Sequence, residues 1–234
     1  TVKELCRVCY TCVRECPAKA IKIVNGQAEV IADRCIGCGN CIKVCSQDAK
    51  VFLQSRIEVK ALLQSDAKVA ALIAPSFPAE FTDVADYKLF VGMLRALGFS
   101  YVFEVAFGAD LVAQQYQHLF EDRSGKGYIS SDCPAIVTYI RYYHPNLVDN
   151  LSPLVSPMVA TSRVVRKKLG DGVKLVFIGP CIAKKDESNE VDEVLTFREL
   201  RSMLEYAGIT AQNVEASDFD QPRAGRGAIF PVSR

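Results

Sequence analysis

Eight of the ten cysteines fall within the first 45 residues, and they form two copies of one pattern. In each copy the spacing is C-x2-C-x2-C-x3-C, and the second copy begins 29 residues after the first. The first copy is Cys6, Cys9, Cys12 and Cys16, and the second is Cys35, Cys38, Cys41 and Cys45. A thiolate at every third residue of a tight loop lets three sulfurs converge on one face of an iron–sulfur cube, while the fourth points elsewhere.

In proteins with two such cubes, the fourth cysteine of each run binds the other cluster. The spacing therefore predicts two [4Fe-4S] clusters that exchange their last ligand. The predicted ligands are Cys6, Cys9, Cys12 and Cys45 for the first cluster, and Cys35, Cys38, Cys41 and Cys16 for the second. Pro17 follows Cys16, as the bacterial pattern expects, whereas Ser46 follows Cys45.

A disulfide framework and zinc sites are the alternative uses of these cysteines. Disulfides do not require two copies of one spacing, and a zinc ribbon has two C-x2-C pairs separated by a longer gap. The pattern favours iron–sulfur binding over both.

The 234 residues leave room for a small domain and a larger one, and half of them are hydrophobic. We expect a ferredoxin-like domain over residues 1–52 and a second domain over 53–234. With 28 Lys and Arg against 27 Asp and Glu, the charge balance gives no reason to expect a nucleic-acid partner. No apolar stretch reaches the roughly 20 residues of a membrane span. Cysteines in reduced, metal-ligand spacing favour the cytoplasm.

The N-terminal domain is predicted to have an α+β ferredoxin-like fold. Alternating residues at 21–24 and 28–31 around Asn25-Gly26 predict a β-hairpin. In each half we expect a short strand pair flanking the cysteine loop and a short helix after it. Because the chain starts at Thr1 without Met and stops at Arg234 without finishing a layer, we expect a piece of a longer protein.

The rest of the chain alternates strand and helix, which predicts an α/β domain with a mostly parallel sheet and helices on both faces. A helix at 53–64 is expected to lead into it, and Thr196 with Glu199 forms a capping box for a helix that ends at Gly208. The predicted strands are 69–74, 101–106, 127–131, 174–178, 193–195 and 228–232. The other predicted helices are 87–97, 111–120, 135–143 and 159–169.

In open parallel sheets, ligands bind beyond the carboxyl ends of the strands. This rule selects Pro75-Ser76, 107–110, 132–134 and 179–181, so both remaining cysteines, Cys133 and Cys181, follow predicted strands. Pro134 is suited to the first turn of a helix, which places the Cys133 sulfur at a helix N-terminus, where the thiolate is favoured. The alternative is that both are buried structural cysteines.

Several of these stretches together resemble the [FeFe]-hydrogenase family. SSDCP at 130–134 and GPCIAKKDE at 179–187 are similar to the first two of its three signature motifs. Further similarity lies in APS at 74–76, FEVAFGADL at 103–111, NLS at 150–152, SP at 156–157 and VLTFREL at 194–200.

The resemblance implies an H-cluster, in which a [4Fe-4S] cube held by four cysteines is bridged to a two-iron centre with CO and cyanide ligands. Cys133 and Cys181 would be two of the four cube ligands. Lys184 would donate to a cyanide, and Pro75 and Ser76 would add hydrogen bonds there. The alternative for Lys184 is a solvated surface lysine.

The chain also departs from this family. The third motif, which supplies the other two cube cysteines, has no counterpart, since no cysteine follows Cys181. Where catalytic members carry a proton-shuttling cysteine, this chain has Asp132, for which bonding of backbone amides at the helix start is the favoured role and proton relay the other. Gln114, Gln115 and Gln117 stand where proton-path glutamates occur, and Gly179 and Met158 replace a typical methionine and glutamine.

These departures resemble the sensory hydrogenase-like proteins. We therefore expect an oxidoreductase that passes electrons through two clusters toward an H-cluster-type site, with slow or sensory hydrogen chemistry in the full-length protein and none in this chain alone. Expected partners are a redox protein such as a ferredoxin and a downstream signalling domain or protein. The alternative function is a non-catalytic electron-transfer or cluster-assembly module. A DNA-binding redox regulator is disfavoured because no basic helix is present.

Overall fold

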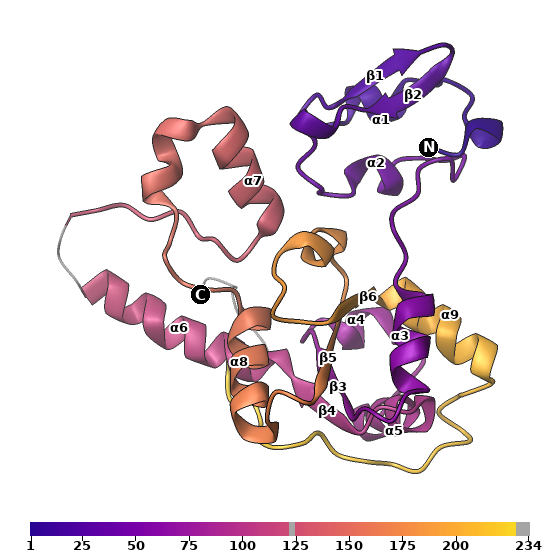
Figure 1. The fold of residues 1–234 in the computed structure, drawn as a ribbon, viewed down its shortest axis with the longest axis vertical. Coiled ribbons are helices and arrows are strands. Elements are labelled where there is room, and N and C mark those ends of the chain that lie inside the picture. The colour runs from indigo at the N-terminus through magenta and orange to yellow at the C-terminus, as the bar shows by residue number, and fades with distance from the viewer. Residues whose placement is uncertain (122–124, 228–234) are drawn as a thin grey trace. The chain divides into compact units, whose positions relative to one another are not determined.

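The computed structural model of the protein describes residues 1–121 and 125–227, and these residues divide into two compact units. One unit, here called the cysteine unit, consists of Thr1–Leu53, Gly127–Ser152 and Cys181–Glu187. The other described residues form the sheet unit (Figure 1). The cysteine unit therefore combines the N-terminal repeat with two segments from much later in the sequence. The domain boundary at 52/53 remains a prediction, because compactness alone does not define a domain.

The repeat in the cysteine unit extends from the sequence to the backbone. The helices of the first half recur in the second at the same 29-residue offset: η1 Lys3–Leu5 with η2 Ala32–Arg34, and α1 Thr11–Arg14 with α2 Asn40–Lys43. Left-handed φ angles recur too. Val8 at 53° corresponds to Gly37 at 67°, Tyr10 at 63° to Gly39 at 77°, and Lys19 at 48° to Asp48 at 50°. The two cysteine loops are thus the same structure built twice.

The expected hairpin is confirmed, with β1 Ile21–Val24 antiparallel to β2 Gln27–Val30 and a turn at Asn25 and Gly26, both at positive φ. Two other expectations were wrong. The short helices lie inside the cysteine runs rather than after them, because the third and fourth cysteines of a run are four residues apart, about one helical turn. In the described residues of the cysteine unit only one strand pair forms. The second half has instead a 2.7 Å hydrogen bond from Val2 N–H to the Ala49 carbonyl.

The cysteine unit is completed by α7 Pro134–Tyr143, η3 Pro145–Asn150 and η4 Ile182–Asp186. The strand expected at 127–131 is not formed. Ile129 makes a single parallel bridge to Leu151, with its amide bonded to the Asn150 carbonyl at 2.7 Å. A stretch with so few apolar residues has too little surface to bury for a place in the central sheet.

The sheet unit contains a four-stranded parallel sheet in the order β4-β3-β5-β6, which confirms the predicted fold class (Figure 1). Its strands are β3 Val69–Ile73, β4 Tyr101–Glu104, β5 Lys174–Gly179 and β6 Glu193–Thr196. Every residue of the central strand β3 is buried, as expected for a strand covered on both faces. The helices are α3 Arg56–Leu63, α4 Phe77–Glu80, α5 Tyr87–Leu97, α6 Val105–Glu121, α8 Pro157–Leu169 and α9 Phe197–Ala207.

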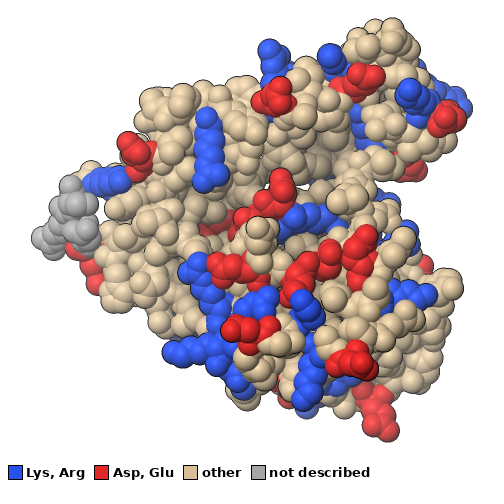
Figure 2. All heavy atoms as spheres, in the orientation of Figure 1, with Lys and Arg blue, Asp and Glu red and all other residues tan. Residues whose placement is uncertain are grey.

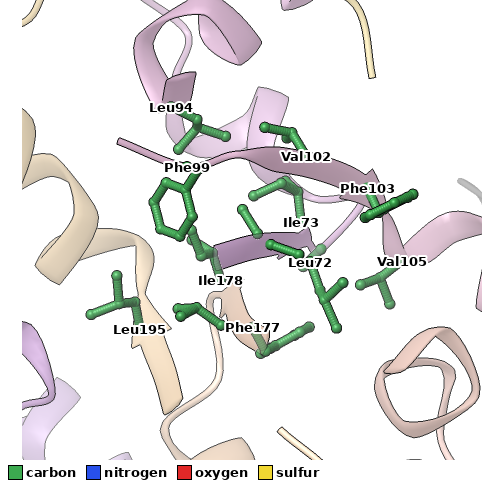
Figure 3. Packing of buried hydrophobic residues seen from close by; sticks show 14 of the residues in the cluster. Leu72, Ile73, Leu94, Phe99, Val102, Phe103, Val105, Phe177, Ile178 and Leu195 are labelled. Carbon is green, nitrogen blue, oxygen red and sulfur yellow. The ribbon is translucent and has the colours of Figure 1, made fainter. Parts of the chain in front are cut away.

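Neighbouring residues along a strand point their side chains into opposite sides of the core. Figure 3 shows Ile73 and Ile178 on the side of Leu94 and Phe99, whereas Leu72 and Phe177 point the other way.

Capping residues mark the ends of helices α5 and α9. Asp86 accepts from the Lys88 amide at the start of α5, Gly98 ends it at φ 115°, and Thr196 and Glu199 form the predicted capping box of α9. Gly208 ends α9, as expected.

The helix expected to begin at residue 111 starts earlier, so the loop predicted at 107–110 is helical. Helix α6 begins at Val105, directly after β4. Small residues allow this, because a Cβ at Gly108 would lie 2.2 Å from Thr161 Oγ1 of α8. The close packing of α6 on α8 therefore decides where the strand stops. The strand expected at 228–232 lies outside the described residues.

Basic and acidic side chains are interspersed on the face drawn in Figure 2, in agreement with the balanced composition. Of the helices formed by the described residues, none has both the length and the apolar character needed to cross a bilayer.

Candidate metal centre

The first predicted ligand set surrounds one pocket of the cysteine unit. Its lining includes Cys6, Cys9 and Cys12 from one loop together with Cys45 from the other. Lys50, Thr1 and Ala28 line the same pocket. Backbone hydrogen bonds from Ala28 and Val8 lower the pKa of the Cys6 thiol, and the hydroxyl of Thr11 lowers that of Cys9. These thiols are thus biased toward the thiolate, the form that binds iron.

The second predicted set surrounds a separate pocket, with Cys35, Cys38 and Cys41 from the second loop and Cys16 from the first. The Ala20 amide donates to the Cys16 sulfur at 3.2 Å. Burial raises the pKa of Cys41 in this pocket and of Cys12 in the other. Each pocket therefore gathers three cysteines of one run and the last of the other.

The arrangement suits a cube better than a single ion. Within residues 1–121 and 125–227, no three His, Cys, Asp or Glu side chains converge on one metal ion. A [4Fe-4S] cluster binds its four thiolates through different irons, so its sulfurs surround a cavity and not a point. All ten cysteines are free thiols in the structure. Four thiols around each pocket match the donor set of a [4Fe-4S] cluster.

Cys133 and Cys181 belong to the same unit as the eight N-terminal cysteines. Cys133 is the N-cap residue of α7, and Cys181 is the N-cap residue of η4. Their loops meet where Lys184 Nζ donates to the Asp132 carbonyl at 2.9 Å. Cys181 follows β5, as the rule for strand ends expects, whereas Cys133 follows a single bridge and not a strand.

Cys181 packs against an apolar cluster that contains cysteines of both predicted ligand sets. Cys12, Cys16, Ala18 and Ile36 share one apolar cluster with Ala135 of α7 and Ala183 of η4, and Cys181 packs against that cluster. Ile182, which follows Cys181, lines the second pocket and would lie 2.9 Å from a Cβ added at Gly39. Cys181 is thus linked by direct packing to the second set of thiols.

Lys184 is not the solvated surface lysine of the alternative interpretation. Its side chain is 13% exposed, and besides the Asp132 carbonyl it forms an ion pair with Glu187, whose side chain is also 13% exposed. Glu187 Oε2 lies within ion-pair distance of Lys184 Nζ, although no donor is aligned with this oxygen for a hydrogen bond. Lys184 therefore holds two segments together through its charge and its donors.

The favoured role of Asp132, bonding backbone amides at the helix start, is wrong. Cys133 is the N-cap residue, and Asp132 Oδ2 accepts instead from the Ser130 hydroxyl at 2.6 Å. Asp132 Oδ1 is buried without a hydrogen-bond partner. The residue is one position too early to cap the helix.

Pro75 and Ser76 lie in the sheet unit, after β3. Ser76 is exposed and is the N-cap residue of the four-residue helix α4, without a side-chain cap bond. Gly179 ends β5, where a Cβ would lie 2.7 Å from the Phe177 ring, and Met158 is buried in α8. The predicted site residues are thus divided between the two units.

Sequence reasoning missed two residues of the cysteine unit. Lys50, beside the first pocket, is 5% exposed, and an isolated lysine after a cysteine run gives no signal of burial. The Tyr143 hydroxyl of α7 lies 2.8 Å from the Ala18 carbonyl and 3.0 Å from the Arg34 carbonyl. Its partners are more than 100 residues away in the sequence, so no local pattern could have revealed them.

The repeated cysteine loops and the parallel sheet define an iron–sulfur protein with an α/β second unit. Comparison with known families makes this more specific. Residues 67–234 match the family described as the C-terminal domain of the iron-only hydrogenase large subunit, and residues 1–46 match a 4Fe-4S dicluster domain. The chain belongs to the iron-only hydrogenase family, and its N-terminal domain is of the kind that binds two [4Fe-4S] clusters.

Individual relatives support the assignment of the chain to this family. The chain is 30% identical over 233 residues to the NADP-reducing hydrogenase subunit HndD of Solidesulfovibrio fructosivorans, covering 85% of this chain and 40% of the relative. It is 29% identical over 201 residues to iron hydrogenase 1 of Clostridium pasteurianum, covering 73% and 35%. It is 25% identical over 215 residues to the cytosolic Fe-S cluster assembly factor NAR1 of Yarrowia lipolytica, covering 76% and 44%.

A solved structure shows the same fold. The apo [FeFe]-hydrogenase HydA1 of Chlamydomonas reinhardtii, variant C377H, matches with a TM-score of 0.62 at 24% identity, over 75% of this chain and 53% of that one. The chain thus spans about half the length of its solved neighbour, and less than half of the three curated relatives.

Proposed function

We propose that this chain passes electrons through two [4Fe-4S] clusters toward a site at Cys133 and Cys181, as part of a hydrogenase-like oxidoreductase. The observation that carries the proposal is the apolar cluster in which Cys12 and Cys16 pack with Ala135, Ala183 and Cys181. Cysteines of both predicted ligand sets thereby share an apolar cluster with Cys181 and with Ala135, which lies two residues after Cys133.

The ligand sets of the proposal follow the two pockets. The first cluster is held by Cys6, Cys9, Cys12 and Cys45, and the second by Cys35, Cys38, Cys41 and Cys16. Ile182 lines only the second of these pockets and is adjacent to Cys181, so the second cluster is the one that hands electrons on. The first cluster then receives electrons from a redox protein such as a ferredoxin, and the exposed Cys9 marks its accessible side.

In the whole protein, an H-cluster bound at Cys133 and Cys181 would supply the hydrogen chemistry. These two thiols are half of a four-cysteine set, so no step of that chemistry is assigned to this chain. Lys184 donates to the Asp132 carbonyl and is the residue that would face a cyanide ligand.

Slow or sensory hydrogen turnover, reported to a downstream signalling domain or protein, is the role we propose for the whole protein, in a reducing compartment such as the cytoplasm. The similarity to assembly factors such as NAR1 supports one alternative, a module that helps to build iron–sulfur clusters. The complete set of eight ligand cysteines, gathered in two pockets, favours electron relay.

Iron counts and electron paramagnetic resonance on anaerobically purified protein test the relay. We expect about eight irons per chain and two reversible one-electron signals. Cys9→Ala is expected to remove only the first cluster and Cys38→Ala only the second, leaving about four irons in each variant. Transfer of iron from the loaded protein to an apo-ferredoxin, with no reversible reduction, would instead support the assembly function. Hydrogen turnover by the full-length protein as fast as that of a dedicated hydrogenase would contradict the sensory role.

A further inference from the structure

A buried lysine lines the first cluster pocket and has no carboxylate partner among the residues that the structure describes. Lys50 is 5% exposed and lines the pocket formed by Cys6, Cys9, Cys12 and Cys45. Its Nζ lies 2.5 Å from the Thr1 hydroxyl and 2.7 Å from the Ala28 carbonyl, and both acceptors are neutral. No ion pair of the described residues includes it.

A buried ammonium group is costly unless an opposite charge lies nearby. In this pocket the groups able to carry that charge are the cysteine thiolates. The charge of Lys50 opposes the effect of burial on the pKa of Cys12 and adds to the backbone hydrogen bonds that lower the pKa of Cys6. Its electrostatic effect also reaches Cys41 of the second set, but Lys50 does not line the second pocket.

Lys50 also supports the backbone that contacts a ligand cysteine. The Ala28 carbonyl accepts from Lys50 and from the Thr1 hydroxyl, and a backbone hydrogen bond from Ala28 lowers the pKa of Cys6. The ammonium is therefore held in place by a small network and cannot swing into solvent. A fixed charge in a buried site acts more strongly than one on a mobile surface side chain.

We propose that Lys50 is a positioning residue that raises the reduction potential of the first cluster more than that of the second. Each one-electron reduction adds a negative charge to a cluster that already carries net negative charge from its four thiolates. A fixed cation beside the first pocket stabilises the reduced form more than the oxidised form. The second pocket has no lysine in its lining, so the effect is unequal. Charge and hydrogen bonds around the sulfurs are general determinants of such potentials.

This inference deepens the proposed function and rests on it. Because Lys50 acts more strongly on the first cluster, it favours storage of an electron there over storage in the second cluster, whose pocket is lined by Ile182 beside Cys181. Electron delivery to the site at Cys181 then depends on how fully the two clusters are reduced. A chain with this arrangement responds to the redox state of its donor, which suits a sensory role.

The test is an EPR-monitored redox titration with dithionite of the loaded protein and of Lys50→Gln, Lys50→Met and Lys50→Arg. Gln keeps N–H donors but not the charge, Met removes both, and Arg keeps the charge. Lys22→Gln on β1, which is exposed, is the matched control. Single-cluster backgrounds, Cys38→Ala for the first cluster and Cys9→Ala for the second, assign each signal.

We expect both neutral variants to shift the reduction equilibrium of the first cluster at least about tenfold toward the oxidised form, about 59 mV for one electron. The second cluster should shift less, and Lys50→Arg and Lys22→Gln should leave the first near its original potential. Equal shifts of both clusters, no shift in the neutral variants, or loss of the first cluster in both neutral variants would overturn the inference. Protein that never binds two clusters would overturn the proposed function itself.

Discussion

The ammonium group of Lys184 donates a 2.9 Å hydrogen bond to the backbone carbonyl of Asp132, and so joins the loops that precede Cys133 and follow Cys181. The same ammonium forms an ion pair with Glu187, the C-cap residue of η4. One side chain thus fixes two segments that are 52 residues apart in the sequence. Whatever these two thiols bind, their relative position depends on it.

Substitution Lys184→Met should therefore destabilise the protein by about 3 kcal/mol, because it leaves the Glu187 carboxylate buried without a cation. Urea unfolding followed by circular dichroism measures the loss, since the chain has no tryptophan for fluorescence. The double variant Lys184→Met/Glu187→Gln should recover part of the stability. If the double variant is as unstable as the sum of the single ones, the two side chains do not act as a pair.

Tyr143→Phe should weaken the attachment of α7 to the cysteine loops. The hydroxyl contacts the carbonyls of Ala18 and Arg34, which flank the second ligand set, and its removal should cost about 1 kcal/mol. Hydrogen–deuterium exchange should become faster in peptides that cover residues 17–21 and 31–35. Tyr142→Phe, at an exposed neighbouring position, is the control and should leave exchange unchanged. Faster exchange in both variants would show that the effect is not due to these bonds.

Tyr10→Gly should stabilise the first cysteine loop, and Gly37→Ala should destabilise the second. Tyr10 holds a φ of 63° that costs a residue with a Cβ about 1–2 kcal/mol, and its side chain is 50% exposed, so little packing is lost. A Cβ at Gly37 would meet nothing within 4 Å, so the loss there measures backbone strain alone. Unfolding free energies at one pH provide the measurement. A loss of stability in Tyr10→Gly would mean that the aromatic ring contributes more than the strain costs.

Asp192→Asn should reduce stability by about 2 kcal/mol at neutral pH and by less in acid. Burial alone raises the pKa of this carboxyl, but the Lys174 side chain, the Leu175 amide and the Arg166 charge outweigh it and hold the pKa below its ordinary value. A depressed pKa contributes stability above the unfolded-state pKa, and this is lost as the pH falls through the folded-state value. The difference between wild type and variant should therefore shrink below about pH 4.

Unfolding curves at several pH values check this expectation, with the exposed Asp66→Asn as the control. A difference between wild type and Asp192→Asn that stays constant down to the lowest pH would show that packing, and not charge, is what the substitution removes.

The sequence alone predicted the features that depend on residues close together in the chain. The spacing of the two cysteine runs predicts the exchange of their last ligands, and the two pockets are lined accordingly. The end of α5 follows from Gly98, and the ends of α9 follow from Thr196, Glu199 and Gly208. The parallel sheet follows from alternating apolar segments. Even the positive φ angles of Gly37 and Gly39 were to be expected of glycines, although those of Val8 and Tyr10 were not.

Only the tertiary structure decided what depends on contacts between distant residues. It moved the start of α6 to Val105, because Gly108 lets α6 pack closely on α8. It assigned Cys133 and Cys181 to the unit of the N-terminal cysteines, and it buried Lys50 and the Lys184–Glu187 pair. Periodicity and caps describe interactions within a few residues of the chain, whereas these placements depend on which surfaces meet after folding.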